Sequence, residues 1–219
     1  MADEILAGVT RSTLEPEALR RFAYACPSIE IQGPGAGPRL CIMAGVHINE
    51  ASSIAAAMRL PHLIDPQLLR GRISIIPVVS THHLYTKAMV TPPSSGVDLH
   101  WSYPGAPDGE FNDALAHWLV CEWAQDADVF LDLHGGDLDE RMARYVVTQR
   151  TGADAFDGSV SQLARCFDAD LNVALAPPET WSAGRICTAL ARNGRRGMVV
   201  EAGDHVHLDR DSVDWINNG

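Results

Sequence analysis

Short apolar runs recur along the chain, and each has the length of a β-strand. Residues 39–46, 73–79 and 129–133 are apolar at nearly every position, which is typical of strands that are buried on both faces of a parallel sheet. We also predict a short edge strand at residues 28–32 and, later in the chain, strands at residues 145–148, 171–175 and 198–200. The pattern therefore predicts a sheet whose middle strands are shielded from water.

Segments with helical composition separate these strands. Residues 49–63 and 110–123 carry apolar side chains at helical spacing. Glycine and proline mark a turn at residues 33–38. Further helices are predicted in the opening of the chain up to about Tyr24 and at residues 159–167 and 184–193. Because strands and helices alternate through most of the chain, we expect an α/β layered domain with a mixed, largely parallel sheet flanked by helices.

Composition narrows the domain organisation and the expected partners. The 219 residues are 46% hydrophobic, which suffices for one sizeable core, so we predict a single domain over residues 1–219. The 28 acidic and 17 basic residues give a net charge of −11, which repels nucleic acid and anionic membranes. Neither nucleic acid nor a membrane is therefore an expected partner.

The N-terminal segment and the cysteines indicate the compartment. Residues 1–4 lack the basic and apolar regions of a signal peptide, and no apolar stretch has the length that spans a membrane. The five cysteines are odd in number, widely spaced and without a C-x-x-C pair, which favours reduced, buried thiols over a disulfide framework or a thiolate zinc site. We expect a cytoplasmic protein.

Candidate chemistry lies at the ends of three predicted strands. His47 follows the first long apolar run, His134 ends another, and Glu201 ends the run at residues 198–200. Ligands of parallel α/β sheets bind outside the carboxyl ends of the strands, so we expect these side chains to lie together. Glu50 falls in the first turn of the predicted helix, and His47-x-x-Glu50 is the only H-x-x-E in the chain. Two imidazoles and a carboxylate form a zinc ligand set that leaves one position open for water.

Each of these residues also has a structural interpretation. His47 would be a strand-end histidine, and Glu50 would be a capping residue near a helix N-terminus. Asp137 competes with Glu50 as a ligand because His134-x-x-Asp137 has a similar spacing, although two glycines between them give a flexible geometry. Asp132 is an alternative partner that would orient a ligating histidine through a hydrogen bond.

Glu201 likewise has two interpretations. A carboxylate that ends an apolar strand is costly to bury unless it is paired, protonated or near a cation. One interpretation is an ion pair with Arg195 or Arg196. The other is a general base that takes a proton from a water activated by zinc.

Other histidines and aromatic residues carry weaker signals. For His82-His83 and for His205-x-His207, a solvated position near a loop is the favoured interpretation, although the second pair follows the last strand closely enough to line a pocket mouth. Three aromatic residues in predicted loops would either wall a pocket or simply pack: Trp101, Tyr103 and Trp181.

Four short motifs occur in order along the chain, at residues 45–50, 98–105, 132–134 and 201–203. They resemble the G-x-H-x-x-E, D-L-N-R-x-F-P-G, D-L-H and E-x-G motifs of the aspartoacylase and succinylglutamate desuccinylase family, part of the zinc carboxypeptidase superfamily. The likeness extends over most of the chain. It implies a zinc-carboxypeptidase-like layered domain, one zinc on His47, Glu50 and His134, and Glu201 as general base and proton shuttle.

Two positions depart from the family pattern. Where the family has Asn-Arg to hold the substrate carboxylate, this chain has His100-Trp101 after Asp98, and an indole does not replace a bidentate guanidinium. The arginine that polarises the scissile carbonyl in the family is replaced near residues 89–90, so Lys87, His100 or an arginine from elsewhere would substitute for it, or zinc alone would carry the charge. The resemblance places Asp98, His100 and Trp101 at the substrate.

A third departure is length, because many family members carry a β-rich C-terminal domain that we expect to be absent from this chain. The leading hypothesis is a zinc-dependent amidohydrolase that removes an acyl group from an N-acyl amino acid or a related small amine. The alternative is a metal-binding or ligand-binding member whose catalysis was lost or altered with the arginines. Association of the chain with copies of itself stays open.

Overall fold

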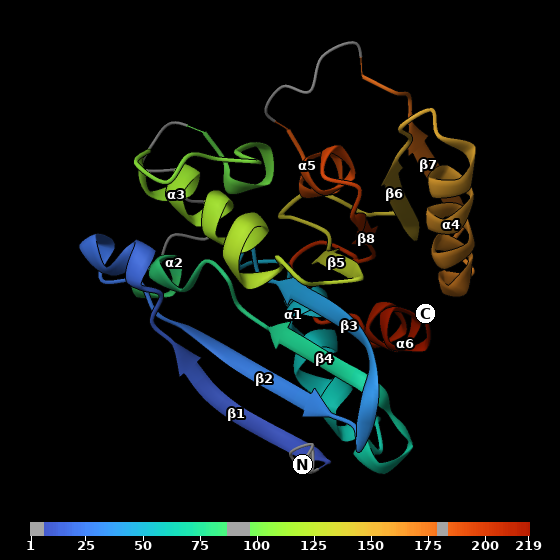
Figure 1. Cartoon of the computed structure of the whole chain (residues 1–219), viewed down its shortest axis with the longest axis horizontal. Helices are drawn as coiled ribbons and strands as arrows, with labels where there is room; N and C mark the ends of the chain where they lie inside the picture. The colour runs from blue at the N-terminus through green and yellow to red at the C-terminus, as the bar shows by residue number, and fades with distance from the viewer. Residues whose placement is uncertain (1–6, 87–96, 179–183) are drawn as a thin grey trace.

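Eight strands form one sheet in the computed structural model, which describes residues 7–86, 97–178 and 184–219 (Figure 1). From edge to edge the strands are β1 (Gly8–Leu14), β2 (Cys26–Gln32), β4 (Arg70–Ile76), β3 (Gly35–Ala44), β5 (Val129–His134), β8 (Arg196–Glu201), β6 (Tyr145–Gln149) and β7 (Leu171–Leu175). The middle strands β4, β3, β5 and β8 are parallel to one another. Strands β1, β2 and β6 are antiparallel to their inner neighbours, and β7 is parallel to β6.

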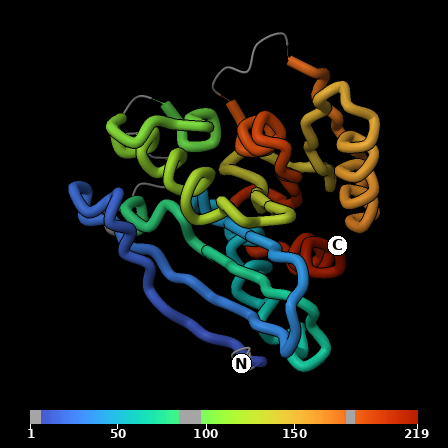
Figure 2. Tube along the Cα trace, in the orientation of Figure 1, coloured from blue at the N-terminus to red at the C-terminus, as the bar shows by residue number. Residues whose placement is uncertain are grey.

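Helices cover both faces of this sheet (Figures 1 and 2). One face carries α1 (Ala51–Arg59), α4 (Asp154–Ala164) and α6 (Arg210–Asn218). The other face carries α3 (Phe111–Trp118) and α5 (Ile186–Arg192). The short helix α2 (Thr81–Thr86) follows β4. The predicted α/β layered domain with a mixed, largely parallel sheet flanked by helices is confirmed.

Strand β3 shows why its residues are apolar without alternation. Cys41 and Met43 belong to the buried cluster that includes α3 and α5, whereas Ile42 and Ala44 belong to the cluster that includes α1 and α6. Successive side chains of a strand point to opposite faces, so a strand that is covered on both sides needs apolar residues at every position.

Parallel pairing aligns the strand ends that carry the candidate residues. Strands β3 and β5 remain in register up to Ala44, and strands β5 and β8 place His134 opposite Glu201. His47 and Glu50 follow β3 directly. The candidate ligands and the candidate base therefore lie together at the carboxyl ends of the parallel strands.

The start of the chain differs from the prediction. Instead of a helix up to about Tyr24, the chain forms β1 and a short 3-10 helix at Glu17–Phe22. Because β1 pairs antiparallel with β2 along its whole length, residues 28–32 lie in an inner strand and not at an edge. Backbone pairing with β2 and β-branched residues such as Val9 outweigh the local helical preference.

Some boundaries also differ. Residues 35–38 belong to β3 and not to a turn, and a register shift between Gly35 and Arg39 lets this glycine-rich stretch remain in the strand. Helix α1 begins at Ala51, so Glu50 is the residue before it and not part of its first turn. The helix expected at residues 110–123 ends in a π-helical turn at Leu119–Trp123. Helices α2 and α6 were not predicted.

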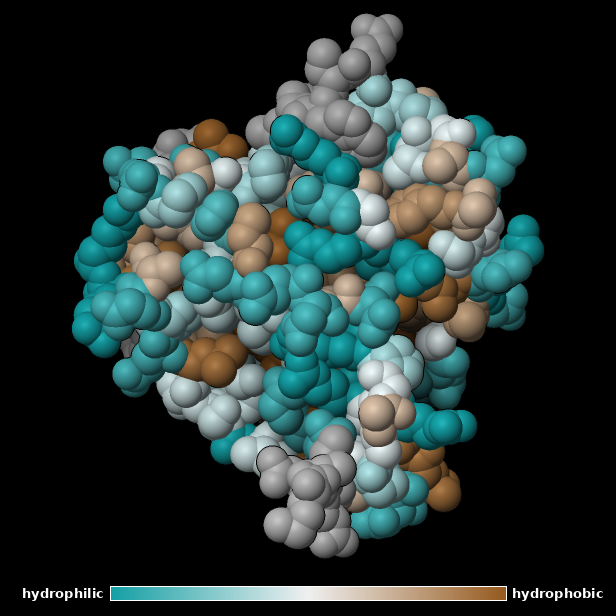
Figure 3. Space-filling view, viewed as in Figure 1, coloured by the Kyte–Doolittle hydropathy of each residue, from teal (hydrophilic) through white to brown (hydrophobic). Residues whose placement is uncertain are grey.

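The face shown in Figure 3 is mostly hydrophilic, with apolar residues in separate patches. Among the described residues, no helix is long and apolar enough to cross a membrane.

None of the five cysteines forms a disulfide, but only Cys26, Cys41 and Cys187 are buried. The expectation of buried thiols is therefore wrong for Cys121 and Cys166, which are exposed.

Candidate functional site

The turn after β3 brings His47 and Glu50 to the edge of the sheet. Gly45 has a φ of 66°, a left-handed conformation that suits glycine, and a Cβ there would lie 3.0 Å from the backbone of Val78. Glu50 stands at the start of α1, but its side chain does not cap this helix. It accepts a hydrogen bond of 3.0 Å from the backbone N–H of Gly135 instead. The carboxylate is thereby fixed next to the end of β5.

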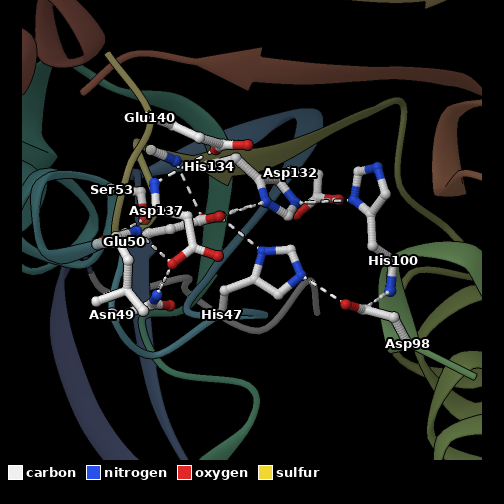
Figure 4. A network of polar contacts seen from close by, with 12 residues as sticks. His47, Asn49, Glu50, Ser53, Asp98, His100, Asp132, His134, Asp137 and Glu140 are labelled. Carbon is white, nitrogen blue, oxygen red and sulfur yellow. Dashed lines mark hydrogen bonds and ion pairs between the residues drawn. The ribbon is translucent and has the colours of Figure 1, made fainter. Parts of the chain in front are cut away.

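Three side chains converge at this point (Figure 4). His47 Nδ1 lies 2.6 Å from Glu50 Oε1, and His134 Nδ1 lies 3.1 Å from Glu50 Oε2. Ligands at about 2.0–2.1 Å from a tetrahedral zinc ion lie about 3.3 Å from one another. One nitrogen from each imidazole and the carboxylate of Glu50 thus have spacings that a divalent ion accommodates after small adjustments, and the donor set fits zinc.

In the metal-free protein, His47, Glu50 and His134 form an ion-paired cluster in which protonated histidines face the Glu50 carboxylate. Burial lowers the pKa of His47, but hydrogen bonds to Asp98 and Glu50 raise it to about 10. Burial raises the pKa of Glu50, but His134 and His47 bring it down to about 2. Burial also lowers the pKa of His134, yet Asp132 and Glu50 hold it well above its ordinary value. A metal ion would replace the protons on the nitrogens that face Glu50, so metal binding releases protons.

Further groups contact the outer nitrogens of both histidines. Asp98 Oδ2 lies 3.0 Å from His47 Nε2, and Asp98 itself accepts the backbone N–H of His100 at the start of a 3-10 turn, Leu99–Trp101. His134 Nε2 lies 3.1 Å from Asp132 Oδ2 and 3.3 Å from His100 Nδ1. A carboxylate behind a ligating imidazole fixes its orientation and raises its basicity.

Glu201 occupies the end of β8, and only 8% of its surface is exposed. Burial raises its pKa to about 7, with Glu50 and Asp132 adding to the rise and His134 opposing it. A carboxylate with such a pKa is suited to take and return a proton near neutral pH. The ion-pair interpretation is not what the structure shows, because Arg195 donates to Val120 and Ala124 carbonyls and Arg196 donates to Ser159.

Sequence reasoning missed Arg185. Its guanidinium carbon stands 4.2 Å from the centre of the Trp101 ring. The preceding residue, Gly184, exchanges two backbone hydrogen bonds with Tyr103, of 2.7 and 3.1 Å, so the start of α5 is tied to the Asp98 loop. Burial and the neighbouring His134 lower the pKa of His100 to about 4, and the positive charge of Arg185 adds to this lowering. The signal in the sequence was an arginine directly before a predicted helix, which by itself is common.

The remaining candidates take different positions. Tyr103 is buried in the core, whereas Trp101 is 47% exposed. Asp137 accepts a hydrogen bond from the Asn49 side chain and belongs to neither of the two groups, among the described residues, whose spacing could hold a metal ion. His82 packs on Phe111, and His205 pairs with Asp204. Three of the sequence-based candidates lie outside the described part of the chain: Lys87, Trp181 and the position near residues 89–90.

The chain is similar to proteins of one family. The family described as "Succinylglutamate desuccinylase/Aspartoacylase catalytic domain" matches residues 36–219. A curated relative, N-alpha-acetyl-L-2,4-diaminobutyric acid deacetylase from Halomonas elongata, is 32% identical over 102 residues. This match covers 47% of the chain and 30% of the relative, so the chain spans less than a third of that protein.

Two solved structures have the same fold. A succinylglutamate desuccinylase from Silicibacter sp. TM1040 superimposes with a TM-score of 0.80 at 21% identity, over 97% of this chain and 64% of that chain. The ectoine utilization protein EutE (DoeB) from Ruegeria pomeroyi, with product bound, gives a TM-score of 0.80 at 22% identity, over 97% and 65%. The chain therefore spans just under two thirds of each.

Proposed function

Because the chain belongs to the succinylglutamate desuccinylase/aspartoacylase family, we propose that it is a zinc-dependent hydrolase that removes the acyl group from an N-acyl amino acid or a related small amine. The observation that carries this proposal is the convergence of His47, Glu50 and His134 on one point at the edge of the sheet. His47 and His134 would each bind zinc through Nδ1, and Glu50 through its carboxylate.

The metal would lower the pKa of a water and polarise the scissile carbonyl. The chain itself supplies the proton transfers. Glu201 would take a proton from the attacking water and then return it to the nitrogen of the leaving amine. Glu201 is buried at the end of β8, opposite His134, and this burial supports the role because it raises the pKa of Glu201 to about 7. Asp98 would hold His47 in the orientation that presents Nδ1.

Arg185 offers the positive charge that residues 100 and 101 lack. Stacking on Trp101 holds the guanidinium beside His100, whose side chain is buried next to His134. Planar guanidinium groups bind carboxylates through paired hydrogen bonds. We therefore propose that Arg185 binds the carboxylate of the substrate, which favours an N-acyl amino acid over an uncharged amide. The deacetylase relative acts, by its name, on an N-acetylated amino acid.

The decisive experiment joins metal content to activity. We expect about one zinc per chain by elemental analysis, and release of free amine from a panel that includes N-acetyl-2,4-diaminobutyrate and N-succinylglutamate. A chelator should abolish the activity and added zinc should restore it. His47→Ala should lose both metal and activity, whereas His62→Ala, which changes an exposed histidine on the α1 side, should keep both.

Two outcomes would contradict the proposal. Zinc binding with no turnover of any N-acyl substrate would favour the metal-binding protein without catalysis, the alternative suggested by His100 and Trp101 in the place of Asn-Arg. Turnover that survives metal removal, with unchanged rates in His47→Ala, would exclude the zinc mechanism altogether.

A further inference from the structure

Two buried imidazoles meet behind the candidate metal centre. His134 turns Nδ1 towards Glu50 and Nε2 away from it, and Nε2 lies within hydrogen-bonding geometry of His100 Nδ1, at 3.3 Å (Figure 4). Both side chains are buried, and their rings meet edge to face with centres 4.7 Å apart. A contact of two ring nitrogens contains one proton only, so one ring must donate and the other must accept.

Binding of zinc to His134 Nδ1 would fix which ring donates. A neutral imidazole that binds zinc through Nδ1 carries its proton on Nε2. His134 must then donate from Nε2, and His100 must accept at Nδ1. Because a neutral imidazole has one proton, His100 keeps that proton on Nε2, on the opposite side of its ring.

Asp132 reinforces the same arrangement. It is fully buried, and neither carboxylate oxygen has a hydrogen-bond partner among the described residues. Its Oδ2 lies 3.1 Å from His134 Nε2, close enough for strong attraction to an N–H group on that nitrogen. The charge of Asp132 therefore favours a proton on His134 Nε2, which is the proton that the contact with His100 requires.

We propose that His100 is a positioning residue: it holds His134 in the zinc-binding tautomer and, through the same hydrogen bond, is itself held as a neutral Nε2–H donor. This inference rests on the proposed zinc site. The His100 ring lies against the Trp101 ring, with centres 4.8 Å apart, and the Arg185 guanidinium lies 4.2 Å from the centre of the same Trp101 ring. Together they would bind an acceptor oxygen of the substrate and its carboxylate.

The protons can be observed directly. In the zinc-loaded protein with ¹⁵N-labelled histidine, long-range ¹H–¹⁵N correlation spectra report which nitrogen of each ring is protonated. We expect both His134 and His100 to carry the proton on Nε2. A proton on His100 Nδ1 would make His100 the donor to His134 Nε2, and it would overturn the inference.

The number of zinc ions bound per chain is a second test of the inference. Asp132, His100 and His134 form another group of atoms spaced for a metal ion. Two zinc ions per chain, both retained at saturation, would make His134 Nε2 a ligand and would exclude its role as a donor. No zinc at all would remove the proposed function, which is a different failure from zinc bound with the wrong tautomer.

Variants test the effect on metal affinity. Loss of a partner behind a ligand typically weakens metal binding by about 10 to 100-fold, and we expect His100→Leu to do so in competition with a chelator. His100→Asn, whose side-chain oxygen accepts a hydrogen bond, should restore affinity to within about threefold of the native value. His62→Leu is the exposed control. Equal affinities for the native chain, His100→Leu and His100→Asn would contradict the positioning role.

Discussion

The same strands border two regions of opposite character. At their carboxyl ends, Glu50, His134 and Asp132 bring charged groups together in a buried cluster. On the α1 and α6 face, a cavity of about 370 Å³ has mostly apolar walls, which include Leu131 and Met198. A large apolar cavity offers room for a ligand, but a binding or catalytic site also needs a few polar groups that point to one place. The cavity has none of the candidate ligands in its lining, so the small polar cluster is the better candidate site.

Neighbouring residues of β5 separate the two regions. Leu131 lines the cavity, and Asp132 faces His134, a candidate metal ligand. This is the alternation of a strand with two covered faces. Substitutions on the polar side should therefore alter metal binding or turnover, and those on the apolar side should alter stability alone.

The largest effects are expected at the candidate metal ligands. His134→Ala should abolish zinc binding and also destabilise the metal-free protein by about 3–5 kcal/mol, because Glu50 and Asp132 would lose the cation between them. His47→Ala should abolish zinc binding with a smaller loss of stability, since 30% of the His47 side chain is exposed. Elemental analysis and urea unfolding measure both quantities. Equal losses of stability in the two variants would contradict the difference in burial.

Much of this arrangement could be predicted from the sequence. Continuous apolar runs identified the inner strands, and parallel pairing then required His47, His134 and Glu201 to meet at one edge. Strand β1 could not be predicted, because its partner β2 and not its own periodicity stabilises it. Arg185 could not be predicted either, because a two-way backbone bridge between Gly184 and Tyr103, far apart in sequence, brings it to Trp101.

Glu201→Gln should give the next largest effect. Without a base, turnover should fall by about 100 to 10,000-fold, while zinc content stays unchanged. Removing a buried charge should also leave the protein at least as stable as the native chain. Glu30→Gln, which changes a partly buried carboxylate on β2, is the control and should keep full activity. Full activity in Glu201→Gln would exclude this residue as the base.

Arg185→Met should affect substrate binding more than turnover. Loss of a charge-assisted contact of about 1.5–3 kcal/mol raises KM by about 10 to 150-fold for substrates with a free carboxylate. Substrates in which that carboxylate is blocked as an amide should lose little. Arg165→Met, at an exposed arginine, is the matched control. If both classes of substrate lost the same factor, Arg185 would have a structural role only.

The metal-free protein should show a smaller, pH-dependent effect. Hydrogen bonds that His47 donates to Asp98 and Glu50 outweigh burial and raise the pKa of His47 to about 10, so protonated His47 stabilises the fold. This contribution is fully present below the unfolded pKa of about 6.5 and is lost as the pH rises towards 10. The melting temperature of the metal-free chain should therefore fall across that range more steeply than that of His47→Asn. Parallel curves for the two proteins would contradict the raised pKa.

The smallest effect on chemistry should come from the cavity, and it is the sharpest test of the comparison. Leu131→Ala enlarges an existing space, so we expect a destabilisation of about 2 kcal/mol, the lower end for such substitutions, with unchanged zinc affinity and kcat. Asp132→Asn, one residue along the strand, should lower zinc affinity by about tenfold at little cost in stability, because it removes a buried charge. Chelator competition and thermal unfolding of both variants measure the contrast. A loss of zinc affinity in Leu131→Ala would mean that the two faces of β5 are coupled, and the separation between the apolar cavity and the polar cluster would fail.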